Sequence, residues 1–134
     1  MISKKKAQVL TSAKRIPDFG VRPGLEVGTR VTLRNQEALD VLKQLLGALN
    51  NTLYESQVSD NHFSFGIKEY IEIPDIEYQR EIGIRGLNIT VVFARKGLRV
   101  KRKKIKQGHV AKKQSISVEE ITKFMEANFQ TTFI

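Results

Sequence analysis

The stretch of residues 63–73 constrains the fold most, because its apolar and polar residues alternate. The odd positions carry Phe63, Phe65, Ile67, Ile71 and Ile73, and the even positions carry Ser64, Gly66, Lys68, Tyr70 and Glu72; only Glu69 breaks the alternation. A period of two residues predicts a β-strand that buries one of its faces. An antiparallel sheet can cover this face with helices and leave its other face open to a partner.

Shorter patterns predict the remaining elements, and together they indicate an α+β fold class. Strands are predicted over residues 8–11, 29–34 and 87–94, with a further short strand within 53–58. Residues 36–49 carry the apolar stripe of a buried helix. Ser117 and Glu120 form a capping box that opens a second helix over 117–129. We therefore expect an antiparallel sheet with helices packed on one face, in a single domain of residues 1–134.

The positive charge of the chain is concentrated in residues 95–113, called the basic segment below. Its ten basic residues are Arg95, Lys96, Arg99, Lys101, Arg102, Lys103, Lys104, Lys106, Lys112 and Lys113, and it has no acidic residue. The chain has 23 Lys and Arg against 14 Asp and Glu, so 13 basic residues remain elsewhere to balance the acids. Such a concentration indicates a polyanion as partner, although a charge run can also be a solvated loop. Its glycines predict an extended loop that orders only on binding.

A long loop is predicted over residues 12–28, which are punctuated by proline and glycine. Loops of this length in compact domains are usually either functional or disordered. The loop carries three cations and one aromatic residue, namely Lys14, Arg15, Arg22 and Phe19. A mobile surface loop without function is the alternative interpretation.

The open face of the predicted sheet is polar. If the strands are neighbours, it carries Arg30, Thr32, Arg34, Ser64, Lys68, Tyr70, Asn88 and Thr90. Cationic side chains bind phosphates, hydroxyls and amides bind sugars and base edges, and a tyrosine can stack on a base. Beside the basic segment, this face favours RNA over duplex DNA. An ordinary solvated sheet face is the alternative.

Several other functions find no support in the sequence. Without cysteine, the chain can form neither a disulfide nor a thiolate metal site. His62 and His109 have no ligand-spaced partner, so we expect no metal and no cofactor. No catalytic motif occurs, and we do not expect an enzyme. No apolar run approaches the ~18 residues of a membrane span, and the basic start lacks the apolar region of a secretory signal.

Two stretches resemble the large-subunit ribosomal protein L-five family, which is called L-eleven in eukaryotic cytosolic ribosomes. They are Phe63-Ser64-Phe65-Gly66-Ile67-Lys68-Glu69 and Ile82-Gly83-Ile84-Arg85-Gly86-Leu87-Asn88-Ile89. The loop over 12–24 and the strand over 31–34 are also similar to the family. The matches run through nearly the whole chain in the family's order. Family members normally begin with a further helix and strand before the residues that match 8–11, whereas this chain starts with a short basic lead.

The resemblance implies a structural constituent of the large ribosomal subunit, in the cytoplasm. The family binds 5S ribosomal RNA and neighbouring ribosomal RNA in the central protuberance, beside other ribosomal proteins. Its long loop reaches toward the P-site tRNA, which would make Lys14, Arg15, Phe19 and Arg22 the tRNA-facing residues here. The basic segment is similar to the archaeal and eukaryotic branch, since the bacterial branch has a much shorter link there.

Two further functions would use the same residues differently. A free-standing RNA-binding regulator could employ the same sheet face and basic segment without entering the ribosome. A protein of the membrane surface would need a basic amphipathic helix, and the basic segment lacks the apolar face of one. In either RNA-binding case, phosphate neutralisation predicts an affinity that falls steeply with salt.

Overall fold

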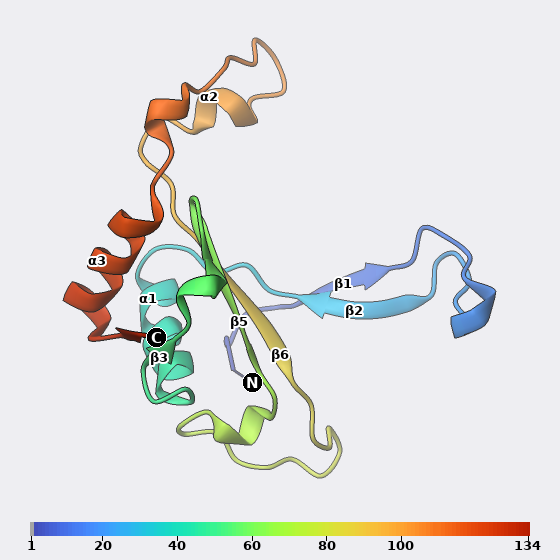
Figure 1. Ribbon diagram of the computed structural model, residues 1–134. Helices are drawn as coiled ribbons and strands as arrows, with labels where there is room; N and C mark the ends of the chain where they lie inside the picture. Colours follow the sequence, from blue (N-terminus) through green and yellow to red (C-terminus); the bar gives the residue numbers. More distant parts are fainter. Residues whose placement is uncertain (1) are drawn as a thin grey trace. The chain divides into compact units, whose positions relative to one another are not determined.

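The computed structural model describes residues 2–134 (Figure 1). The chain divides into two compact units, Met1–Leu42 and Lys43–Ile134, and the boundary falls within helix α1 (Gln36–Gly47). The prediction of a single domain over residues 1–134 stays a prediction beside this division. The mixture of helices with antiparallel strands confirms the α+β fold class.

The first unit contains an antiparallel ribbon of two strands, β1 (Gln8–Thr11) and β2 (Glu26–Arg30) (Figure 1). The strand predicted over 8–11 is confirmed. The strand predicted over 29–34 is wrong in its bounds, because β2 begins at Glu26 and ends at Arg30. Arg30 pairs with Gln8, the first residue of β1, so residues 31–34 have no further β1 residue to pair with.

The segment between β1 and β2 is folded back on itself rather than irregular. It contains a 3-10 turn, η1 (Pro17–Phe19), which ends at Gly20 with φ of 63°, in the left-handed region. Ile16 and Val21 exchange backbone hydrogen bonds of 2.9 and 3.0 Å across this turn. The predicted loop over 12–28 is therefore an extension of the ribbon, and its last residues belong to β2.

The second unit is built on a three-stranded antiparallel sheet of β4 (Val58–Ser59), β5 (His62–Ile67) and β6 (Leu87–Val92), in that order. A separate parallel pair joins β3 (Thr52–Leu53) to β7 (Thr132–Phe133), and the turn η2 (Glu55–Gln57) lies between β3 and β4. Burial alternates along β5, so the period-two pattern correctly predicts which of its residues face inward.

The predicted strand over 63–73 is wrong beyond Ile67. Ile67 pairs with Leu87, the first residue of β6, so the residues after Ile67 have no partner strand. They turn instead into η3 (Tyr70–Glu72), where Tyr70 is only 3% exposed. The Tyr70 hydroxyl accepts a hydrogen bond of 2.9 Å from the backbone N–H of Gln79. Tyr70 is therefore a core residue and does not lie on the open sheet face.

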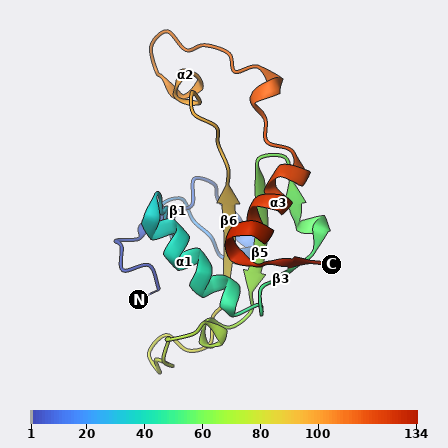
Figure 2. The ribbon, with the colours of Figure 1, turned by 90° about the vertical axis from the view of Figure 1, so that its left-hand side faces the viewer.

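Helix α3 (Val118–Phe129) packs on the buried face of this sheet; Figures 1 and 2 both show it on the same side of β5 and β6. The helix predicted over 117–129 is confirmed, and the Ser117 hydroxyl accepts from the Glu120 N–H at 3.4 Å. The core of the second unit comprises Leu45, Leu46, Leu53, Val58, Phe63, Phe65, Ile67, Tyr70, Ile73, Ile121, Met125 and Phe129. Its rings are in contact, since Phe93 lies 5.9 Å from Phe63 and 5.7 Å from Phe124 between centroids.

The basic segment projects beyond the end of β6 in both Figure 1 and Figure 2. It is mostly irregular, as predicted, but contains the one-turn helix α2 (Arg99–Arg102), and η4 (Lys112–Gln114) begins within it. The Lys101 N–H donates to the Leu98 carbonyl oxygen and the Lys103 N–H donates to the Arg99 carbonyl oxygen, both at 3.1 Å. The prediction of an extended loop is therefore wrong over these residues. Among the described residues, no helix combines the length and the hydropathy that crossing a membrane requires.

Candidate nucleic-acid interface

The outward face of β5 and β6 brings together three of the predicted polar residues. The strand register sets Ser64 opposite Thr90, and their hydroxyl oxygens are 3.0 Å apart. Asn88 lies opposite Gly66 in the next pair, and all these residues are exposed. Because side chains alternate along a strand, Ser64, Asn88 and Thr90 share one face, as predicted. Their contact with RNA stays a prediction.

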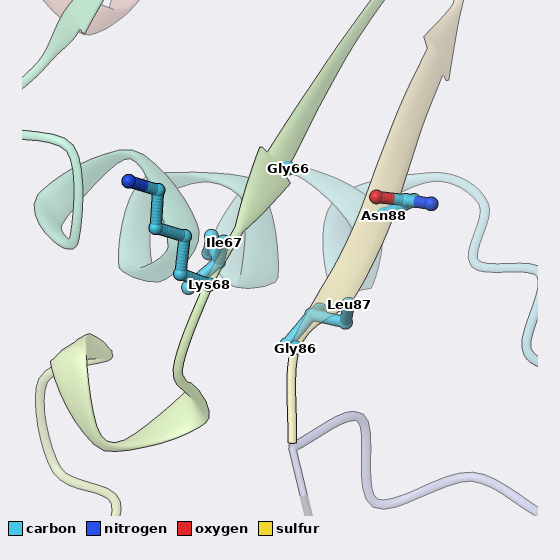
Figure 3. Close-up of a pocket in the computed structure, with 6 residues that line it drawn as sticks. All are labelled: Gly66, Ile67, Lys68, Gly86, Leu87 and Asn88. Carbon is cyan, nitrogen blue, oxygen red and sulfur yellow. The ribbon is translucent and has the colours of Figure 1, made fainter. Parts of the chain in front are cut away.

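A shallow hollow of about 440 Å³ opens at one end of this face, between β5 and β6. It is lined by Gly66, Ile67, Lys68, Gly86, Leu87 and Asn88 (Figure 3). The two strands approach each other closely there, because a Cβ atom on Gly86 would lie 2.8 Å from the Lys68 carbonyl oxygen. In Figure 3 the Lys68 side chain extends away from Asn88, so a cation and an amide border the hollow on different sides.

The other predicted members of the sheet face lie elsewhere. Arg30 belongs to the β1–β2 sheet, where its Nη2 donates to Gln8 Oε1 at 3.0 Å. Thr32 and Arg34 follow β2 and are exposed. The prediction that these three residues share a sheet with Ser64 is wrong, because the strand pairing that it assumed does not form. Tyr70 is buried, as described above, so it cannot stack on a base from its present position.

The ribbon of the first unit presents its predicted residues to solvent. Lys14, Arg15 and Arg22 are exposed along the segment between the strands. Phe19 ends η1 with 81% of its surface exposed, which is high for a large apolar side chain. The Ser12 hydroxyl donates to the Lys14 carbonyl oxygen at 2.7 Å and helps to order the backbone beside these cations.

The basic segment leaves and re-enters the second unit at neighbouring points, which Asn61 holds together. The Asn61 carbonyl oxygen accepts from the Phe93 N–H at 2.8 Å, directly after β6 and before the segment begins. On the returning side, Asn61 Oδ1 accepts from the Ile116 N–H at 2.8 Å, and Asn61 Nδ2 donates to Ser115 Oγ at 2.9 Å. The Asn61 N–H also donates to the Ile116 carbonyl oxygen, at 3.0 Å.

Arg95 differs from the other cations of the basic segment. Its Nη2 lies 2.6 and 2.7 Å from the two carboxylate oxygens of Glu120, at the start of α3. The pair therefore adds a second tie between the ends of the segment, and part of the Arg95 charge is neutralised internally. All ten basic residues of the segment are exposed, and nine remain when Arg95 is set aside.

The sequence gives little indication of the residues that hold the two ends of the basic segment together. The composition of Ser59-Asp60-Asn61 is typical of a turn, but nothing local marks the Asn61 side chain as a bridge to residues more than 50 positions away. Gly66 carries a weak signal in the sequence, since glycine inside a strand often marks a close approach, whereas Gly86 lies outside the predicted strand. Within residues 2–134, no group of three or more His, Asp or Glu side chains could hold a metal ion.

Comparison with known proteins identifies the family. A family model that describes the C-terminal part of the ribosomal L-five family matches residues 26–129. The large ribosomal subunit protein uL5 of Methanobrevibacter smithii is 36% identical over 119 residues, which cover 88% of this chain and 70% of that protein. The protein of the same name from Sulfurisphaera tokodaii is 38% identical over 129 residues, covering 94% and 73%.

A third relative extends the same result. The large ribosomal subunit protein uL5 of Nanoarchaeum equitans is 41% identical over 120 residues, which cover 88% of this chain and 71% of that protein. The family model spans β2 to the end of α3, and so includes the sheet, the hollow and the basic segment. The chain therefore belongs to the ribosomal L-five family.

Proposed function

We propose that this protein binds 5S ribosomal RNA and neighbouring large-subunit RNA in the central protuberance, and that its β1–β2 ribbon reaches toward the P-site tRNA. The observation that carries the proposal is the basic segment, in which nine exposed cations stand without an acidic neighbour in sequence. Such a segment repels itself unless a polyanion neutralises it, and RNA phosphates do so most directly.

Family membership gives a coarser assignment. A member of this family is a structural protein of the large ribosomal subunit and not an enzyme. Its location is accordingly the ribosome, in the cytoplasm. The proposal concerns the finer level of which RNA molecules the chain contacts, and with which surfaces.

The contacts proposed for the ribosomal RNA divide into two kinds. The nine exposed cations of the basic segment neutralise phosphates, which supply affinity and set the position of the RNA. Ser64, Asn88 and Thr90 meet sugars and base edges, because hydroxyls and amides can donate and accept hydrogen bonds there. The tied ends of the segment support this division, since they fix the place from which the cations project.

The ribbon is suited to a different kind of contact. Exposed cations flank Phe19 in the sequence, and its backbone ends a hydrogen-bonded turn from which the ring extends into solvent. A ring presented in this way can stack on a nucleoside while Lys14, Arg15 or Arg22 meets a phosphate. A tRNA offers both groups at its surface.

The experiment compares binding of the purified chain to 5S ribosomal RNA with binding to an unrelated RNA of equal length, across a salt series. We expect a clear preference for 5S ribosomal RNA at moderate salt. Replacing Lys101, Arg102, Lys103 and Lys104 with alanine should make the slope of log affinity against log salt shallower by about 3, because each neutralised phosphate contributes roughly 0.7–0.9.

The matched control replaces Lys43 and Lys123, two exposed lysines on helices of the second unit, with alanine. This control should leave the slope nearly unchanged. Equal binding of both RNAs by the parent chain would contradict the proposed 5S recognition. An unchanged slope in the fourfold variant would contradict the role given to the basic segment.

A further inference from the structure

We propose that the hollow between β5 and β6 is a subsite for one unpaired nucleotide of RNA, preferentially an adenosine. The base would lie over the backbone of Gly66 and Gly86, with its edge hydrogen-bonded to the amide of Asn88. The inference rests on the proposed RNA-binding function and specifies what this part of the sheet face binds.

The hollow exists because Gly66, at an outward position of β5, has no side chain, and because Gly86 lets the two backbones approach closely beside it. Outward positions alternate along each strand, so Ser64, Gly66 and Lys68 follow one another on one side of the hollow. Thr90, Asn88 and Gly86 follow one another on the other side, in the opposite direction. Gly66 and Gly86 place no side chain between Asn88 and Lys68, which both line the hollow (Figure 3).

The fold itself requires only one of these two glycines. A Cβ on Gly86 would lie 2.8 and 2.9 Å from two backbone carbonyl oxygens, those of Lys68 and Ile67, so the strands could not pair as they do. Gly66 has neither a left-handed φ nor a backbone atom within 3.4 Å of an added Cβ. The nearest atom to that Cβ would be Asn88 Oδ1, at 3.2 Å. A side chain at position 66 would thus obstruct the Asn88 amide without disturbing the sheet.

Glycine and asparagine are both depleted in strands, yet they face each other here as a cross-strand pair. Glycine within a strand often marks a bulge, a tight bend, or the close approach of a ligand or another backbone, and the regular register through Gly66 shows no bulge. Among the described residues, no backbone atom would come closer than 4.0 Å to a Cβ added at Gly66. Within residues 2–134, the Asn88 side chain makes no hydrogen bond, although Ser64 and Thr90 pair with each other one step away. The exposed Asn88 amide and the glycine beside it therefore leave room for the edge of a flat ligand.

The chemistry of these groups favours an unpaired base. An asparagine amide has both a donor and an acceptor, and it can bind adenine at N6 and N7 together. Sequence-specific RNA-binding proteins typically recognise unpaired bases that are splayed out of a loop or bulge. The hollow is shallow and open to solvent, so a flat base can lie across it without entering a closed cavity. Lys68 borders the hollow and can neutralise the adjoining phosphate.

The test fills the hollow without changing the charge of the chain. In Gly66→Val, a β-branched side chain favoured in strands replaces glycine at an exposed position, so folding should be retained. We expect this variant to bind 5S ribosomal RNA roughly tenfold more weakly at a fixed salt concentration, with the same salt slope. Chemical probing of the bound RNA should then show a single unpaired adenosine that the parent chain protects and the variant leaves reactive.

A second variant and a control complete the design. Asn88→Leu keeps a side chain of similar size but removes the amide, and it should reproduce the loss of protection at the same nucleotide. If Gly66→Val does not fold, Asn88→Leu alone tests the subsite. The control is Val92→Ile, which adds bulk on the same face outside the hollow and should bind as the parent does.

The outcomes separate the subsite from the proposed function. If the parent binds 5S ribosomal RNA, and Asn88→Leu or a folded Gly66→Val matches it in affinity and protection, the subsite is refuted while the function stands. If the parent shows no preference for 5S ribosomal RNA over the unrelated RNA, the proposed function fails and the subsite fails with it. Loss of protection at a guanosine or pyrimidine would overturn the preference for adenosine.

Discussion

Replacing Asn61 with alanine is expected to lower the free energy of unfolding of the second unit by about 2–5 kcal/mol. Asn61 lies in the turn between β4 and β5 and ties both ends of the basic segment to it. Alanine removes both side-chain hydrogen bonds, those to Ser115 and Ile116. It also has to adopt a φ of 66°, in the left-handed region.

The magnitude follows from these two losses. Each side-chain hydrogen bond contributes about 0.5–1.5 kcal/mol, which gives about 1–3 kcal/mol for the pair. Holding alanine in the left-handed conformation costs about 1–2 kcal/mol, whereas asparagine and glycine visit that region routinely. Asn61→Gly should therefore lose only the hydrogen bonds, about 1–3 kcal/mol. Asn61→Asp should lose least, because a carboxylate still accepts from the Ile116 N–H and can accept from the Ser115 hydroxyl.

Urea denaturation followed by far-ultraviolet circular dichroism measures the three variants against the parent chain. The expected order of stability is parent, Asn61→Asp, Asn61→Gly and Asn61→Ala. Hydrogen exchange should show faster exchange of the Phe93 and Ile116 amides in Asn61→Ala. Equal stability of the glycine and alanine variants would refute the conformational part of the reasoning. A glycine variant as stable as the parent would refute the contribution of the side chain.

Three further predictions test other parts of the molecule. Ser117→Ala should lower the free energy of unfolding by only about 0.5–1 kcal/mol, because the hydrogen bond from the Glu120 N–H to the Ser117 hydroxyl is long, at 3.4 Å. Ser117→Asp should retain the stability of the parent, and an alanine variant as stable as the parent would show that the cap contributes nothing. Gly86→Ala should cost about 1–3 kcal/mol, because it forces two backbones apart, while Gly66→Ala should not; equal midpoints in a thermal melt would contradict this difference. Replacing residues 13–23 with a short turn should leave incorporation into large subunits intact but weaken P-site tRNA retention, and loss of incorporation in a sucrose gradient would assign the ribbon a different role.

The alternation of residues predicts the faces of β5 and β6 because it depends only on the geometry of a single strand. Side chains point to opposite sides in turn, so burial could be assigned residue by residue. The end of β5 could not be predicted in the same way. In this antiparallel pair, the last residue of β5 lies opposite the first residue of β6, so the start of β6 sets the end of β5. Residues 68–73 continue the apolar pattern, but they have no partner strand.

Strand pairing also explains why the candidate site was only partly predictable. Ser64, Asn88 and Thr90 were placed correctly because β5 and β6 do pair. The alternating pattern around Arg30 predicts a strand but not its neighbour, and this strand pairs with β1 instead of β5 or β6. Which strands become neighbours depends on contacts between distant parts of the chain, and local periodicity carries no information about them.

Because the two ends of the basic segment are tied together, the length of the segment can vary among members of this family. Asn61 and the Arg95–Glu120 pair fix the two ends, so the intervening chain behaves as a closed loop. The entropic cost of closing a flexible loop rises by only about 0.6 kcal/mol for each doubling of its length. Insertions and deletions between the ties should therefore be nearly neutral for stability, so the reach of the segment can change while the sheet stays constant.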